Sequence, residues 1–350
     1  MARFREKALS QGFSKTAVDI LIKSWRPNTR KVYSYFIEKY ISFCKIEGVN
    51  MFEPRIEDGI NFLSLIFQSG VSYNRLCLAR AALSSFLVLK NQKFGEHPLV
   101  ARFMKGAFEE KPVFKWETKL PKWDANSVIS FLETWQPNNQ LTLKEVSYKL
   151  TFLLAILTGQ RCQSLSLIKL NNLIFQEEKV TILFTDLLKH SRRKAQQAPI
   201  DILGFHDESL CVIRLLRIYI QLTKDLRGSE QRLLISFRKP YKAIGPETIS
   251  RWIKHVLKAS GINVNIKAHQ TRGISTSLAK AAGIPIGEIM KAAGWAQQTT
   301  FNKFYKCYIK PFAGLMTGKK HSPKLVYKHY ITLKSFLLRR ARQISRKGNN

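Results

Sequence analysis

Six side chains between residues 161 and 305 are of the types needed to break a phosphodiester without a metal. That chemistry requires a nucleophile, fixed positive charge for the non-bridging oxygens, and a proton for the leaving oxygen. Arginine suits the second task because its planar guanidinium binds two phosphate oxygens and stays charged. Tyrosine can be the nucleophile if cations or a base favour its phenolate, since its ordinary pKa is about 10. The candidates are Arg161, Lys189, His269, Arg272, Trp295 and Tyr305.

Local patterns predict where four of these candidates lie. The segment "LTGQR" places Arg161 just past a helix break, and "LLKHSRR" places Lys189 after a predicted strand, in a basic loop. In "HQTR", His269 and Arg272 are three residues apart, so both can face the same way on a helix. Taken singly, an isolated Arg is usually a surface residue and an isolated His is usually structural.

The other two candidates are as ordinary when taken alone. Trp295 follows a glycine in "AAGW" and would by itself be assigned to a core, while Tyr305 ends "FNKFY". Tyr308 is a rival for the nucleophile, and Lys179 and Lys194 are rivals for Lys189. Only the order of the whole set, and not any one member, distinguishes these residues from ordinary structure.

Composition points to a polyanionic partner. The chain has 350 residues, with 58 Lys+Arg against 24 Asp+Glu and a net charge of +34. Nucleic acid is the first candidate partner and an anionic membrane surface the second. No apolar run reaches the roughly 20 residues of a membrane span, and the first 15 residues lack the apolar stretch of a secretory signal. The five cysteines form no CxxC pair, which indicates reduced thiols in an intracellular protein, and no metal site is expected.

The elements that must position the candidates fall into two groups. Helical spacing and cap residues predict four helices between about 28 and 110, with residues 1–12 as a loose basic tail and 111–123 as a linker. After the linker we expect a helix from Asp124, a long apolar helix broken at Thr158–Gly159, and a hairpin turning at Glu177–Lys179. A third strand is predicted within 198–203, then helices including "GPETISRWIKHVLKASG" and three in 269–305.

The ordered set of Arg, hairpin Lys, HxxR, Gly-Trp and Tyr resembles the tyrosine recombinases: phage integrases, the Xer and Cre enzymes, and recombinases of DIRS-type and Crypton transposons. "TGQR", "AAGW" and "TFNKFY" look most like the eukaryotic transposon group. The resemblance covers roughly residues 28–312. It implies a mainly α fold with a small β-sheet: a helical, SAM-like core-binding domain at 13–118 and an α+β catalytic domain at 119–312. A basic tail follows at 313–350.

The resemblance also implies a role for each candidate. Arg161 and Arg272 would clamp the scissile phosphate, and Trp295 would donate its indole N–H to a phosphate oxygen. The remaining roles concern protons and the nucleophile, and no metal, cofactor or ATP is implied. Lys189 would be the general acid for the leaving 5′-oxygen, His269 would assist proton transfer, and Tyr305 would form a 3′-phosphotyrosyl bond.

Two features depart from the pattern. Many relatives carry an acid three residues after the first Arg, where this chain has Ser164, so support of Arg161 is open. The gap from Trp295 to Tyr305 is one residue longer than in most bacterial members, which keeps Tyr308 as an alternative.

The favoured function is a site-specific recombinase or integrase acting on double-stranded DNA held by the two domains. The alternatives are a catalytically inactive DNA-binding protein derived from such an enzyme, and a type IB topoisomerase. The resemblance implies a homotetramer on two DNA sites and no membrane partner. A helix through Leu333, Phe336 and Leu337 is the candidate for reaching a neighbour. The expected location is the nucleus in a eukaryote, and otherwise wherever the cell holds its DNA.

Overall fold

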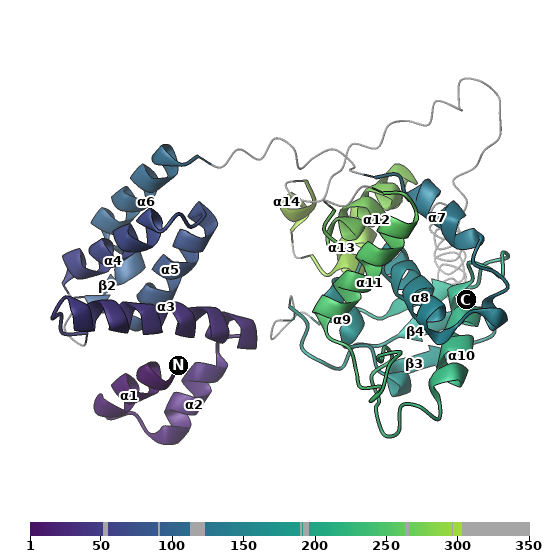
Figure 1. Cartoon of the computed structure of the whole chain (residues 1–350), viewed down its shortest axis with the longest axis horizontal. Helices are drawn as coiled ribbons and strands as arrows, with labels where there is room; N and C mark the ends of the chain where they lie inside the picture. The colour runs from purple at the N-terminus through teal and green to yellow at the C-terminus, as the bar shows by residue number, and fades with distance from the viewer. Residues whose placement is uncertain are drawn as a thin grey trace, which may run out of the picture. The chain divides into compact units, whose positions relative to one another are not determined.

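The computed structural model describes residues 1–51, 55–89, 92–112, 123–189, 191, 196–262, 266–295 and 297–302. The chain divides into two compact units, unit 1 (Met1–Lys115) and unit 2 (Trp116–Asn350), shown in Figure 1. Tyr305, Tyr308, Lys194 and the basic tail from 313 lie outside the described residues. Among the described residues, no helix combines the length and the apolar character needed to cross a membrane.

Unit 1 is helical, and its core is made by the four helices that periodicity predicts. Phe36 and Tyr40 of α3 pack with Phe62 of α4 and Leu83 of α5, and all four are at most 1% exposed. A hairpin of two two-residue strands was not predicted, because so short a strand shows no alternation. The elements are α1 Ala2–Ser10, α2 Lys15–Lys23, α3 Pro27–Ile46, α4 Ile56–Gln68, α5 Tyr73–Phe86, β1 Val88–Leu89, β2 Gln92–Lys93, η1 Phe94–Glu96 and α6 Pro98–Glu110.

The prediction of a loose tail at residues 1–12 is wrong, because this stretch forms α1. Its helix carries Phe4 and Ala8 on one side, and both pack against Val18 and Ile22 of α2. The sequence pattern did not indicate this helix, because charged residues separate the few apolar residues of its buried face. Lys7 also donates to the carbonyl of Phe86 at 3.0 Å, which fastens α1 to the end of α5.

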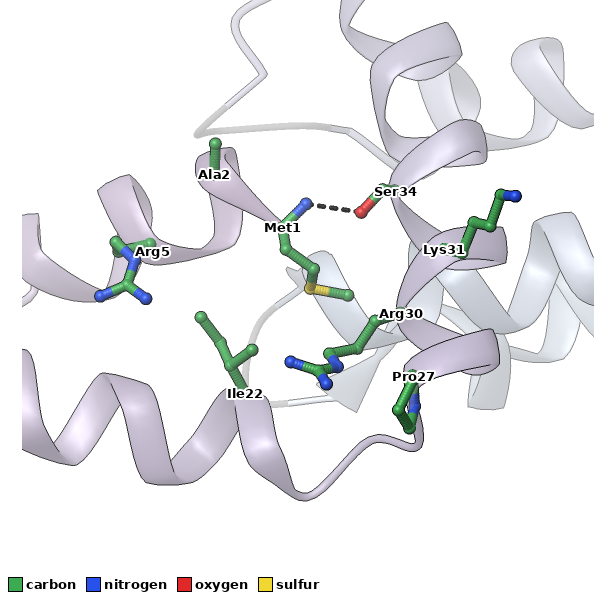
Figure 2. Close-up of a pocket in the computed structure, with 8 residues that line it drawn as sticks. All are labelled: Met1, Ala2, Arg5, Ile22, Pro27, Arg30, Lys31 and Ser34. Atoms are coloured by element: carbon green, nitrogen blue, oxygen red, sulfur yellow. Dashed lines mark hydrogen bonds between the residues drawn. The ribbon is translucent and has the colours of Figure 1, made fainter. Parts of the chain in front are cut away.

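A cavity of about 440 Å³ lies where α1 and α2 meet the start of α3 (Figure 2). Arg30 points into it between the side chains of Met1 and Ile22, and Arg5 and Lys31 add positive charge at its edge. Arg5 comes from α1, and Arg30 and Lys31 come from α3, so both helices place positive charge at this cavity.

Unit 2 combines a three-stranded antiparallel sheet with helices, which confirms the predicted fold class. The strand order is β3-β4-β5, with Phe175 paired to Val180 and Val180 to Ile202. The predicted hairpin and third strand are therefore both present, but Lys179, predicted to lie in the turn, is the first residue of β4. The elements are α7 Ala125–Glu133, η3 Asn138–Gln140, α8 Leu143–Thr158, α9 Cys162–Ser166, η4 Leu170–Asn172, β3 Leu173–Phe175, β4 Lys179–Ile182, β5 Ile200–Leu203, α10 Val212–Thr223, α11 Pro246–Ala259, α12 Gln270–Ala281, α13 Ile286–Ala293 and α14 Gln298–Thr300.

Helix α8 is the centre of unit 2. It starts at a capping box, in which the hydroxyl of Thr142 accepts from the N–H of Glu145 and the carboxylate of Glu145 accepts from the N–H of Thr142. From Val146 to Thr158 every residue is buried, because α10, α11 and α12 pack around it. Most of these buried residues are apolar, as expected of a helix that other elements surround. Its C-terminal end is therefore a rigid base for the turn that leads to Arg161.

The predicted linker ends sooner than expected. Residues 113–122 lie outside the described residues, but Trp123 is 5% exposed and its ring lies 6.1 Å from that of Phe152 in α8. Trp123 is therefore part of the unit 2 core and not of a linker. Asp124 follows it as the predicted N-cap of α7, accepting from the N–H groups of Asn126 and Ser127.

Candidate active site

The structure brings His269 together with three of the predicted cations. Burial lowers the pKa of His269 from 6.5 to about 4, with further contributions from the charges of Arg272, Arg161 and Lys189. His269 precedes α12 as its N-cap and is exposed as a whole residue. Repulsion between cations weakens with distance, so these four side chains, distant in sequence, share one place in unit 2.

The turn "TGQR" starts at the last residue of α8 and places Arg161 just after that helix. Gly159 caps α8 in the left-handed conformation, at φ 60°, and a Cβ there would lie 3.2 Å from the Oγ of Ser275. Glycine meets both demands, since it adopts positive φ without strain and adds no side chain. Arg161 follows in an extended conformation as the N-cap of α9 and is partly exposed. The predicted helix break is confirmed.

Arg272 lies in the first turn of α12 and is 1% exposed. Its guanidinium donates from Nη1 to the carbonyl of Gly159 at 2.6 Å and from Nη2 to the carbonyl of Ala293 at 2.5 Å. Its Cζ lies 4.7 Å from the centre of the Trp295 ring, a cation–π contact. One side chain thus joins the end of α8, the start of α12 and the end of α13.

Trp295 follows α13, which Gly294 closes in the left-handed conformation at φ 64°. The backbone N–H of Trp295 donates to the carbonyl of Met290 at 2.9 Å, which fixes the turn. The indole is 7% exposed and lies 5.8 Å from the ring of Phe301. Trp295 therefore has the core role expected of an isolated Trp and also lies against Arg272.

Lys189 and its rival Lys179 have different surroundings. Lys179 is the first residue of β4, and its Nζ forms an ion pair with Asp201 of β5 at 3.3 Å. Lys189 lies beyond the end of β4, is exposed, and its charge acts on His269. The geometry therefore favours Lys189 over Lys179, while Lys194 lies outside the described residues.

Sequence reasoning missed the carboxylate that supports the Lys189 segment. Asp186 forms ion pairs with Arg232 at 2.9 Å and Lys169 at 3.2 Å. Burial opposes ionisation of Asp186, but the hydrogen bonds from Arg232 and Lys169 outweigh it, and the pKa of Asp186 is lowered. Arg232 also donates to the carbonyl of Leu167, just past α9. Asp186 is the only acid between Glu178 and Asp201, a signal that could have identified it.

The chain belongs to the phage integrase family. The model of the "Phage integrase family" matches residues 120–308, which is more than half of the chain. No curated protein sequence matches the chain. Among solved structures, the XerH site-specific recombinase bound to palindromic difH substrate is 15% identical, with a TM-score of 0.56 over 85% of this chain and 83% of that one.

A second similar structure is the integrase of transposon Tn1549 in complex with transposon right end DNA. It is 13% identical, with a TM-score of 0.56 over 84% of this chain and 93% of that one. At these identities the likeness shows the fold. It spans both units, and the recognised resemblance to tyrosine recombinases is confirmed at the level of family and fold.

Proposed function

We propose that the chain is a site-specific DNA recombinase that cuts and rejoins DNA through Tyr305. The observation that carries this proposal is that the charges of Arg272, Arg161 and Lys189 all act on His269. Phe301, four residues before Tyr305, packs on Trp295 beside Arg272. Four residues span at most roughly 14 Å, so the length of the chain after Phe301 allows Tyr305 to reach the site.

The arginines would stabilise charge on the phosphate. Arg161 is partly exposed and can meet a phosphate in the described conformation. Arg272 is held by two carbonyls before any DNA arrives, and such preorganised charge is usually the largest contribution to catalysis. Because Arg272 is 1% exposed, the chain that covers it must shift when DNA binds.

The remaining groups would handle protons. With its pKa at about 4, His269 is neutral at pH 7 and can accept a proton from the attacking phenol. The phenol oxygen of Tyr305 bonds to phosphorus, the bond from phosphorus to the 5′-oxygen breaks, and Lys189 gives that oxygen its proton. The 3′-phosphotyrosyl bond keeps the energy of the broken linkage, so a 5′-hydroxyl can reverse the step without ATP.

Unit 1 offers a second set of groups suited to DNA phosphates. On α3 and α5, the Nζ of Lys39 and the Cζ of Arg75 lie 5.2 and 5.1 Å from the ring centre of Tyr35. Hydrogen bonds from Lys39 and Arg75 lower the pKa of Tyr35, which is 44% exposed. Three donors on an exposed face, in a chain of net charge +34, support binding of the phosphate backbone. The proposed assembly is a homotetramer on two DNA sites.

A nicked substrate tests the reaction. After cleavage the short 5′-hydroxyl strand diffuses away, so an active enzyme stays covalently bound to DNA and is detected on a denaturing gel. We expect attachment by the wild-type chain, loss with Tyr305→Phe and retention with Tyr308→Phe. Peptide mapping identifies the linked residue. Binding without attachment would instead support an inactive derivative, and repeated relaxation of supercoils without strand exchange a type IB topoisomerase.

A further inference from the structure

The last turn of α13 receives side chains from three distant parts of unit 2. A helix leaves its final carbonyls without partners inside the helix. Gln160 donates from Nε2 to the carbonyl of Ala292 at 2.5 Å. Gln197 donates from Nε2 to the carbonyls of Lys291 at 3.2 Å and Ala292 at 3.3 Å. Arg272 donates to the next carbonyl, that of Ala293.

These glutamine bonds are not needed to end the helix. The N–H of Gly294 donates to the carbonyl of Lys291 and that of Trp295 to the carbonyl of Met290, which already closes α13. The glutamines instead come from 132 and 94 residues away in the sequence. Their effect is to fix α13 against other segments of the unit.

Both glutamines are buried and their amides are oriented unambiguously. Gln160 is 4% exposed and Gln197 is 8% exposed. A backbone carbonyl can only accept, so the NH₂ group of each amide must face α13. Gln160 directly precedes Arg161, and Gln197 lies three residues before β5 and eight residues after Lys189 in the sequence. The bond of Gln160 therefore ties the residue before Arg161 to the helix that leads into Trp295, and the bonds of Gln197 tie the chain that enters β5 to the same helix.

We propose that Gln160 and Gln197 are positioning residues, which set α13 and the chain after it in register with Arg161 and with the Lys189 segment. This role rests on the proposed function. Gln160 would act through Arg161 and Trp295, on charge at the phosphate. Gln197 would act through Lys189, on the proton for the leaving oxygen. The two roles predict different responses to the leaving group.

The test uses Gln160→Met and Gln197→Met in the full chain, because methionine keeps the length and removes the donor. Gln221→Met, at an exposed position of α10, is the matched control. We expect a fall of about 10- to 100-fold in the rate of covalent attachment at saturating nicked DNA, as small misplacements of reacting groups produce. The Kd for uncut DNA should stay within about twofold of wild type, since neither side chain is at the surface.

A substrate with sulfur in place of the bridging 5′-oxygen separates the two roles. A thiolate leaves without a proton, since thiol pKa values are near 8.5. This substrate should restore Gln197→Met to the wild-type rate and leave Gln160→Met slow. Gln160→His keeps a donor and should recover part of the rate on the ordinary substrate. Thermal unfolding confirms that each variant is folded; should Gln160→Met not fold, Gln160→His and Gln197→Met carry the test.

The outcomes separate the two hypotheses. Wild-type attachment with both methionine variants as fast as Gln221→Met would overturn the positioning role. If both variants responded equally to the sulfur substrate, the assignment of different roles to Gln160 and Gln197 would be wrong. Failure of the wild-type chain to attach would overturn the proposed function itself.

Discussion

Replacing Arg272 with alanine should destabilise unit 2 as well as abolish cleavage. Its guanidinium fills space beside Trp295 and supplies donors to the carbonyls of Gly159 and Ala293. Alanine removes both donors and leaves two carbonyls in a site where the arginine was 1% exposed. Arg272→Lys keeps one charge but loses the planar fork, so it should fall between alanine and wild type.

The size of the effect can be worked out from these contacts. Each lost bond to a charged donor costs about 1.5–3 kcal/mol, and a desolvated cation–π contact about 2 kcal/mol. The substitution also removes a buried charge, and the desolvation cost that is thereby avoided offsets several kcal/mol of the lost stability. We therefore expect Arg272→Ala to lower the free energy of unfolding by about 3 kcal/mol. For a domain of this size, that lowers the Tm by roughly 6–12 °C.

The assay is thermal unfolding followed by circular dichroism, with covalent attachment to nicked DNA measured well below both transitions. Tyr305→Phe serves as the control, because it removes the nucleophile and not the contacts of Arg272. An Arg272→Ala variant with the wild-type Tm would refute the structural role of this guanidinium. Attachment at the wild-type rate would refute its catalytic role.

Three further predictions concern charge. NMR should show that His269 titrates near pH 4. Because its pKa in the folded chain lies below 6.5, the free energy of unfolding should fall as the pH drops from about 6.5 to 4. A measured pKa above 6 would contradict the burial that lowers it. Lys149 is 0% exposed and burial lowers its pKa to about 8, so the unfolded chain holds more protons above that pH. Stability should rise by roughly 3 kcal/mol between about pH 8 and 10.5 in urea titrations, and Lys149→Met should remove that rise. Arg75→Gln should raise the pKa of Tyr35 in ultraviolet titration and reduce the salt slope of DNA binding by about one. Lys45→Gln, in the last turn of the helix that carries Tyr35, should leave the Tyr35 pKa unchanged.

Local signals in the sequence predicted most helices and the sheet. The apolar run of α8, the glycine break at Gly159 and the alternation in β4 each depend on near neighbours, so they can be read without the fold. Helix α1 was missed because its apolar face is only Phe4 and Ala8, and Trp123 was assigned to a linker because its partner Phe152 is distant in sequence.

The sequence suggested the members of the proposed site and not the contacts that support them. The order of the motif singled out five described candidates, but it carried no information on the contacts that hold them in place. They are Arg161, Lys189, His269, Arg272 and Trp295. The bond from Arg272 to Gly159 spans 113 residues, and that from Gln160 to Ala292 spans 132. No local pattern marks a glutamine that will meet the end of a remote helix, because the pairing exists only after folding.

The burial of Arg272 bears on how such proteins lose activity over time. A lineage that gave up strand cutting would still keep this residue, because discarding it weakens the fold. The presence of Arg272 in a related protein is therefore weak evidence that the protein is catalytically active. The presence of Lys189 is stronger evidence of activity, because Lys189 is exposed and its loss would destabilise the fold little.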